Sequence, residues 1–252
     1  MRFDYLTNDT ERSLAPFFSP RMLGITFNCV LILGLLLMVL WPKTDPFNFI
    51  EEHRIPLIFP VIFVAALLMN SYVNLRCGRG EMSPEEFLTR LERKNVIRLE
   101  EEYEFLSYGL VQFLLHTLFL LLLMLPLLIV SATISGISLP VFSKGLSILF
   151  TTSLLCRMCG FLMYLRYGRW SRVGYLLARI FFILFIFVTG FFAGFANPIL
   201  LIYSLHRGEE ILTRFPLSAH SLYMIIVTAA ILLLILSNHA MLRRNIYKEK
   251  ST

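Results

Sequence analysis

Six long apolar segments constrain what this chain can fold into. They cover residues 22–41, 55–75, 106–130, 141–165, 174–196 and 221–242. Each matches the roughly 20 residues that a helix needs to cross a bilayer. They are too long for strands and lack the alternating pattern of a membrane β-barrel. The sequence therefore predicts an all-α polytopic membrane protein with six transmembrane helices. Because the connections are short, residues 1–252 are expected to form a single transmembrane domain.

Basic residues predict how the chain is oriented in the membrane. Cytoplasmic loops carry an excess of Lys and Arg. Placing both termini in the cytoplasm puts most basic residues on that side, among them Arg76, Arg79, Arg166, Arg169, Arg172, Arg243 and Arg244. The sequence thus predicts a multi-pass protein of the cytoplasmic membrane with both termini inside. The net charge of +6 is explained by this orientation and by contact with anionic lipids, so it does not indicate nucleic-acid binding.

Residues 1–21 are predicted to lie at the membrane surface. This segment mixes aromatic and charged side chains, a composition that suits a short amphipathic segment at the interface. It contains no short apolar region followed by a small-residue cleavage site, so it does not resemble a secretory signal. We therefore expect an interfacial N-terminal segment, with a frayed tail as the alternative.

A charged amphipathic helix is predicted in the cytoplasmic loop of residues 76–104, between the second and third apolar segments. Ser83 can cap this helix, Pro84 suits its first position, and Glu86 stands where it can complete a capping box. The candidate contact residues on this helix are Glu85, Phe87, Leu88, Arg90, Leu91, Glu92 and Arg93. Acidic residues outnumber basic ones in the loop, which makes anionic lipid a poor ligand. We expect a protein partner here; the alternative is a helix that lies on the headgroups and only links two spans.

Few polar residues interrupt the apolar segments. Those considered as pathway or interface residues are Asn28, Gln112, His116, Arg157 and Arg179, and the spans also contain Asn70 and Asn74. Arg157 and Arg179 lie near the cytoplasmic ends of their segments, where long basic side chains can snorkel to the headgroups. A role in transport is the alternative for both, because charge within a span is costly. Cys156 and Cys159 lack a second Cys or His pair, so no metal site is predicted.

The layout resembles the membrane subunit of an ABC transporter of the ABC-2 type, the type-2 exporter class. Residues 17–21 (FFSPR) resemble the interfacial entry of that family, and the charged helix that begins near Pro84 stands where the family has its coupling helix. Residues 131–140 are similar to the tight outer turn between the third and fourth spans. Residues 197–205, within an outer region of residues 197–218, resemble the short re-entrant elements that precede the last span.

The resemblance implies the function of a permease, with a bias toward export. It implies a translocation pathway formed by a dimer with a second copy or a related permease. It also implies separate ATPase subunits that bind ATP and Mg, contact the charged helix and carry out hydrolysis. This chain would then be no enzyme and would hold no cofactor of its own.

Two other function classes stay open. Glu209, Glu210 and Arg214 form an E-E-x-x-x-R pattern that resembles the first motif of a membrane-embedded protease family. The following Phe215 and His220 do not have the spacing of that family's next motif. The second alternative is a membrane scaffold that transports nothing. A phosphate-binding loop of the type G-x-x-x-x-G-K-[ST] is missing from the sequence, so the chain cannot hydrolyse ATP through that motif.

Overall fold

All regular elements in the described part of the protein are helices. The computed structural model describes residues 20–41, 57–77, 99–167, 171–208, 211 and 217–250. The long helices are α2 (Pro20–Leu40), α3 (Ile58–Cys77), α5 (Leu99–Ile134), α6 (Leu139–Tyr167), α7 (Ser171–Phe192) and α9 (Ala219–Lys250). A 3₁₀ turn, η2 (Gly194–Ala196), and a short helix, α8 (Pro198–Arg207), lie between α7 and α9. The predicted all-α class is confirmed for these residues.

The helices have the length and composition expected in a membrane. Four stretches within the described residues are long and apolar enough to cross a bilayer: Ile58–Leu75, Thr117–Ile134, Leu139–Met163 and Ala219–Met241. Shorter apolar stretches, Gly24–Leu40 and Leu176–Phe192, lie in α2 and α7. Many large apolar side chains face outward, with Phe191 and Phe192 among the most exposed. Extensive apolar surface of this kind marks contact with a membrane or a partner, and together these features indicate a helical membrane protein.

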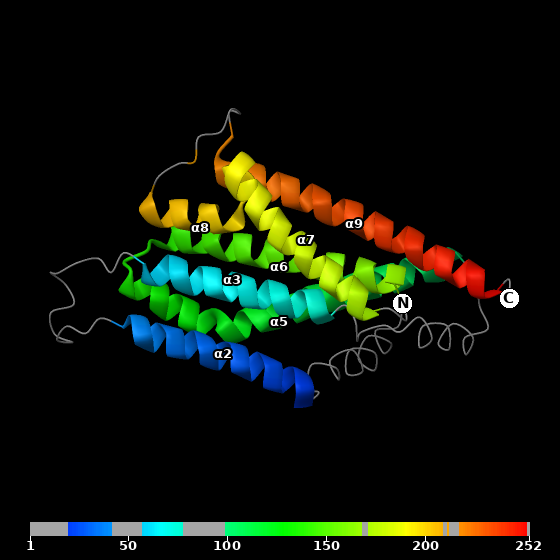
Figure 1. The fold of residues 1–252 in the computed structure, drawn as a ribbon, viewed down its shortest axis with the longest axis horizontal. Helices are drawn as coiled ribbons and strands as arrows, with labels where there is room; N and C mark the ends of the chain where they lie inside the picture. Colours follow the sequence, from blue (N-terminus) through cyan, green and yellow to red (C-terminus); the bar gives the residue numbers. More distant parts are fainter. Residues whose placement is uncertain are drawn as a thin grey trace.

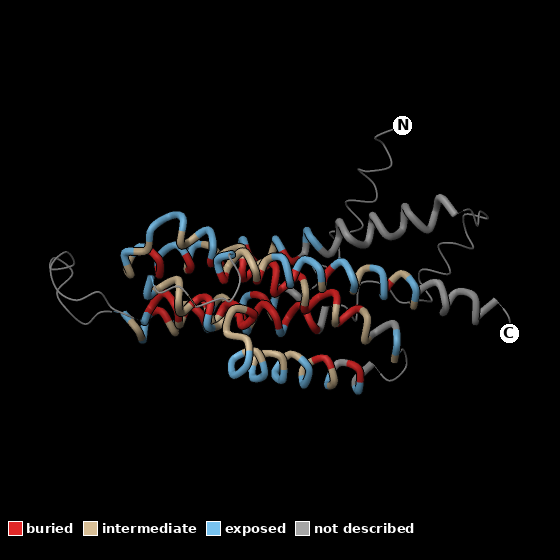
Figure 2. Tube along the Cα trace, turned by 90° about the horizontal axis from the view of Figure 1, so that it is seen from above, coloured by how far each residue is buried: buried red, intermediate tan, exposed pale blue. Residues whose placement is uncertain are grey.

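Helices α3 and α6 form the centre of the bundle. They run side by side, with α5 and α2 on one side and α7 and α9 on the other (Figure 1). Among the four candidate spans, those of α3 and α6 are the most buried and that of α9 is the least. Figure 2 shows the same distribution, with buried residues along the middle of the bundle and exposed residues on its outer faces.

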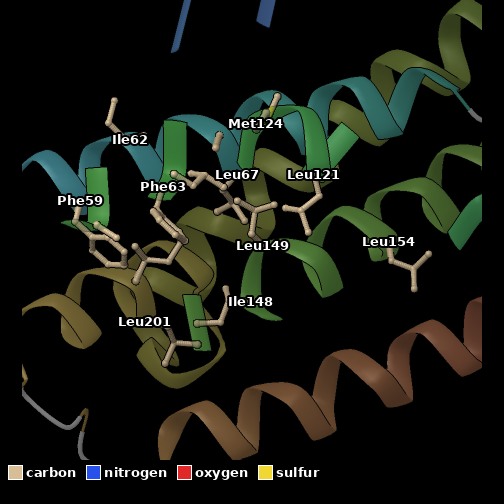
Figure 3. Packing of buried hydrophobic residues seen from close by; sticks show 14 of the residues in the cluster. Phe59, Ile62, Phe63, Leu67, Leu121, Met124, Ile148, Leu149, Leu154 and Leu201 are labelled. Carbon is tan, nitrogen blue, oxygen red and sulfur yellow. The ribbon is translucent and has the colours of Figure 1, made fainter. Parts of the chain in front are cut away.

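Aromatic and aliphatic side chains fill one end of the α3–α6 contact. The rings of Phe59 and Phe63 lie 4.3 Å apart, centroid to centroid, and Phe142 meets Phe63 edge-on at 5.7 Å. Figure 3 shows both α3 rings close to Ile148 of α6 and Leu201 of α8. Burying side chains of this size is worth roughly 1.5–3 kcal/mol each. The short helix α8 is therefore part of the core.

At the other end, α3 and α6 are in backbone contact through a glycine. A Cβ atom added to Gly160 would lie 2.4 Å from the carbonyl oxygen of Leu75. Real Cβ atoms do not approach an oxygen this closely, so only glycine fits here. Small residues at helix contacts allow backbones in a membrane to approach each other. Gly160 thus sets the distance between the two central helices.

The turn between α5 and α6 is shorter than predicted. Residues 131–134 belong to α5, and only residues 135–138 form the turn. Gly136 has a φ of 63°, a left-handed conformation that ends helices readily. The hydroxyl of Ser135 accepts a hydrogen bond from the backbone N–H of Phe59 at 3.1 Å. The turn therefore also satisfies one of the free amides at the start of α3.

Other element boundaries also differ from the sequence-based prediction. Helix α5 begins at Leu99 rather than at residue 106, so residues 99–104 continue into the span. Helix α7 ends at Phe192, before the predicted end at residue 196, because the chain turns through η2 at that point. The predicted interfacial segment, apart from its last two residues, and the predicted coupling helix, with contact residues Glu85, Phe87, Leu88, Arg90, Leu91, Glu92 and Arg93, lie outside the described residues.

Candidate functional site

A buried cluster of polar side chains around Arg157 is the strongest candidate site. Arg157 lies on α6 and is fully buried. Its Nη1 atom donates a hydrogen bond to the side-chain oxygen of Asn74 on α3 at 2.9 Å. The hydroxyl of Thr117 on α5 donates to the same oxygen at 3.3 Å. The side-chain amide of Asn74 in turn donates to the carbonyl of Asn70 at 2.8 Å. One asparagine therefore joins three helices.

The surroundings of Arg157 are polar for the interior of a membrane bundle. Asn70 and Ser71 of α3 are fully buried, and so is Ser153 of α6. Within the described residues, the side-chain amide of Asn70 has no hydrogen-bond partner. Buried polar groups are costly in a membrane, and ionisable residues inside spans commonly mark functional sites. The cluster is thus more polar than helix packing alone requires.

The prediction that Arg157 snorkels to the headgroups is wrong. Its side chain turns inward to Asn74 and has no exposed surface. Distance along the helix could not show the face of α6 on which Arg157 lies. That face is set by the packing of α6 against α3, whose Asn74 is 83 residues away in the chain. Position within one span could not reveal this partner.

The other predicted polar residues lie apart from this cluster or are not described. Asn28 is exposed on α2. Gln112 and His116 belong to α5, as Thr117 does, but their side chains lie outside the described residues. Arg179 is on α7, where it contacts Tyr72. Sequence reasoning missed Thr117. Asn70 and Asn74 lie one turn apart in an apolar segment, and this spacing was a usable signal for the buried polar face of α3.

A second set of polar contacts ties α6 to α9. The hydroxyl groups of Thr152 and Tyr223, both fully buried, are hydrogen-bonded at 2.5 Å. The side-chain amide of Asn238 donates to the carbonyl of Met158 at 3.3 Å. Hydrogen bonds between helices in a membrane are worth about 1 kcal/mol or less each. These contacts fix the register of α9 on α6 more than they add stability.

Ser147 of α6 and His220 of α9 lie as close together as a nucleophile and its base. Their Oγ and Nε2 atoms are 2.9 Å apart, the geometry of such a pair. However, the hydroxyl of Ser147 also donates to the carbonyl of Lys144 at 2.8 Å. The backbone N–H groups around Ser147 donate the hydrogen bonds within helix α6, so they cannot stabilise an oxyanion. We interpret the pair as a further tie between α6 and α9.

Two further sequence patterns concern the protease-like motif and a pair of cysteines. Glu209, Glu210 and Arg214 of the protease-like pattern lie outside the described residues. Cys156 and Cys159 are free thiols on α6. Among the side chains that the structure describes, no three His, Cys, Asp or Glu residues gather as metal ligands would. The described residues thus form buried hydrogen bonds between helices rather than a recognisable catalytic group.

The break between α7 and α8 is built around Asn197. Its side-chain oxygen accepts hydrogen bonds from the amides of Ile199 and Leu200 at 2.9 and 3.1 Å, which caps α8. Its side-chain nitrogen donates to the carbonyl of Ile186 at 2.7 Å and to the hydroxyl of Thr189 at 3.2 Å. This one side chain therefore starts α8 and fastens it to the end of α7.

Two substitutions of Asn197 should weaken the connection between α7 and α8 to different extents. Asn197→Ser keeps an oxygen that can cap α8 but loses the bonds to α7, whereas Asn197→Ala loses both. We expect a cost of about 1 kcal/mol for serine and about 2–3 kcal/mol for alanine. Thermal unfolding in detergent, followed by circular dichroism, measures the difference. Thr189→Val, which removes only one of the acceptors, is the control. An alanine variant as stable as this control would show that Asn197 does not hold the break.

The chain matches no protein-family model, no curated protein and no solved structure in the comparisons made. Its function is therefore inferred from its own sequence and geometry.

Proposed function

We propose that the chain is the permease subunit of an ATP-driven ABC transporter of the ABC-2 type, an exporter. In this proposal α2, α3, α5, α6, α7 and α9 are six transmembrane helices with both ends of the chain in the cytoplasm. Two such bundles, from two copies or from a related second permease, line a pathway between them. Separate ATPase subunits bind ATP and Mg and supply the energy.

The observation that carries the proposal is the broken connection between α7 and α9. A bundle of simple up-and-down helices needs only a short turn at this place. Here η2 and α8 intervene, and Leu201 and Ile202 of α8 are buried in the bundle core. Short helical elements before the last span are what the resemblance to ABC-2 permeases implies. Their close packing supports a structural role at the outer side of the bundle.

The position of the undescribed segment 78–98 supports the proposed coupling. This segment joins the end of α3 to the start of α5. Asn74 of α3 accepts a hydrogen bond from Arg157, and Thr117 of α5 donates one to Asn74. A force applied to the segment would reach α3 and α5 first, and α6 through Arg157. Such a connection transmits motion only if its contacts differ between two states of the transporter.

The coupling helix is tested by a paired substitution. Phe87→Ala together with Leu91→Ala should greatly weaken ATPase binding, because each buried apolar side chain is worth roughly 1.5–3 kcal/mol. Glu85→Ala should have a small effect, since exposed charges contribute about 0–1 kcal/mol. The measurement is co-purification from native membranes in mild detergent, with mass spectrometry to identify a subunit that carries a phosphate-binding loop.

Two results would contradict the proposal. If the wild-type protein is isolated without any ATPase, the chain is not a permease of this class. If an ATPase is present but the double variant retains it fully, the charged helix is not the coupling element, and the transporter assignment would need another contact.

A further inference from the structure

The buried side of α3 repeats itself after one turn. Asn70 and Asn74 are identical residues four positions apart, and so are Phe59 and Phe63; all four are fully buried. Residues four positions apart lie one above the other on the same face of a helix. Figure 3 shows both rings on the side of α3 that is near α6. The surface of α3 therefore offers α6 nearly the same contacts at two positions one turn apart.

The two asparagines differ in whether their side chains are hydrogen-bonded. The side-chain oxygen of Asn74 accepts a hydrogen bond from Arg157 of α6 at 2.9 Å, and its nitrogen donates to the carbonyl of Asn70 at 2.8 Å. In the part of the chain that the structure describes, neither the oxygen nor the nitrogen of the Asn70 side chain has a partner. A buried amide left without partners is costly. Asn70 is therefore an unused acceptor of the same chemistry, one turn from the acceptor in use.

Two glycines of α6 lie at the contacts with α3. Gly160 lies beside the carbonyl of Leu75, whereas a Cβ atom added to Gly145 would lie 2.9 Å from the ring of Phe63 and 3.6 Å from that of Phe59. Residue numbers thus rise together along the two helices, which run in the same direction. Gly145 already lies next to both rings of the repeat. Because a glycine has no side chain, neither contact blocks a movement of α6 along α3.

We propose that α6 has two registers on α3, one turn apart, and that Arg157 exchanges Asn74 for Asn70 between them. In the second register α6 lies about 5 Å nearer the start of α3. Gly160 then lies beside Ser71, a small residue that permits close backbone contact. Shifts of one packed helix past another by a single turn are an established form of conformational switching.

The slide separates the bundle into two bodies. The hydrogen bond between Thr152 and Tyr223 holds α9 to α6, and that between Thr117 and Asn74 holds α5 to α3. The turn of residues 135–138 joins α5 to α6. Four extended residues reach about 13 Å, so this turn is long enough to follow the movement. Helices α6 and α9 therefore move together past α3 and α5.

The two registers deepen the proposed function, and they rest on the permease proposal only for what drives the slide. In that proposal the ATPase acts on segment 78–98, which joins α3 to α5. A push on this segment moves the body of α3 and α5 along α6. The registers then supply the two arrangements, with different contacts, that energy coupling requires.

The test measures two distances in the isolated chain, without ATPase or nucleotide. Pairs of spin labels are attached to exposed positions, at Leu68 of α3 with Ser143 of α6 and at Leu68 with Arg166 of α6. The native cysteines are replaced, and double electron–electron resonance is recorded in phosphatidylcholine nanodiscs. Ser143 and Arg166 lie toward opposite ends of α6. A slide therefore lengthens the first distance and shortens the second, whereas a swing of the Arg157 side chain alone changes neither.

Asn70→Asp and Asn74→Asp are the matched variants. Each adds the same charge without changing the size of the side chain, and a carboxylate accepts a stronger hydrogen bond from a guanidinium than an amide does. Asn70→Asp should move α6 into the second register, with opposite changes in the two distances that approach about 5 Å each. Asn74→Asp should keep both distances of the wild type. Equal distances in the two variants would overturn the proposal, and so would changes of the same sign in both label pairs.

A second comparison decides the question if a buried aspartate prevents folding, which circular dichroism reveals. Asn74→Leu removes the acceptor in use and should favour the second register, because Asn70 remains. The double variant Asn70→Leu with Asn74→Leu removes both acceptors and should keep the distances of the wild type. Identical distances in the single and double variants would overturn the two registers. Since no ATPase is present, that failure leaves the permease proposal standing, and a missing ATPase partner leaves this result unaffected.

Discussion

Gly160→Ala should sharply lower the temperature at which the protein unfolds in detergent. The added methyl group would lie 2.4 Å from the carbonyl oxygen of Leu75, so α3 and α6 must separate to admit it. Overpacking costs typically 1–3 kcal/mol. Because the opposing atom belongs to the backbone and cannot rotate away, we expect a loss of about 3 kcal/mol. Thermal unfolding followed by circular dichroism measures it.

Other glycines of the same protein supply graded controls. Gly34→Ala on α2 meets no atom within 4 Å and should leave stability nearly unchanged. Gly145→Ala would bring a methyl group 2.9 Å from the ring of Phe63, a side chain that can shift, so an intermediate loss is expected. If Gly160→Ala unfolds at the same temperature as Gly34→Ala, the two central helices are not in backbone contact.

Asn74→Leu should be the most damaging single change in the Arg157 cluster. It removes the oxygen to which Arg157 and Thr117 donate, while the buried guanidinium stays. Losing a buried hydrogen bond to a charged group costs about 1.5–3 kcal/mol, because the guanidinium N–H can no longer donate to that oxygen. Denaturation of the reconstituted protein, with helix content as the signal, measures the loss.

The double variant Arg157→Met with Asn74→Leu tests whether the loss comes from the buried charge. Methionine and leucine replace the pair with apolar groups of similar length, a change that is often tolerated. The double variant should therefore be more stable than Asn74→Leu alone. If the losses of stability measured for Asn74→Leu and Arg157→Met alone add up to that of the double variant, Arg157 and Asn74 are not energetically coupled.

The sequence predicted the long helices well, because the physical requirement behind them is simple. A helix must present about 20 apolar residues to cross a bilayer, and each predicted segment coincides with one long helix of the structure. The errors lie where hydrogen bonds decide the boundary. The apolar run of residues 174–196 continues past the end of α7, yet Asn197 starts a new helix and bonds back to Ile186. Hydropathy carries no signal for such a break.

The candidate site was only partly predictable. Arg157 stood out as a charge in an apolar segment, but its contact with Asn74 depends on how closely α3 and α6 approach. That approach is set by Gly160, three residues further along α6. A glycine and an arginine on neighbouring turns of one span indicate a tight helix contact, but the opposite helix can be identified only from the fold. The same holds for Tyr72 beneath Arg179, since α3 and α7 are far apart in the chain.

The central place of α3 has a consequence for how the protein is made. Its span has a mean hydropathy of 1.9, against 2.6 for that of α5, and it carries the buried polar residues Asn70, Ser71 and Asn74. Chains emerge from the ribosome N-terminus first, so α3 enters the bilayer before Arg157 and the rest of α6 have been synthesised. Until α6 is made, the polar face of α3 lacks its native contacts with that helix. The insertion machinery or another helix must then shield this face from lipid. Nascent chains that stop before α6 should therefore be the ones that quality control removes.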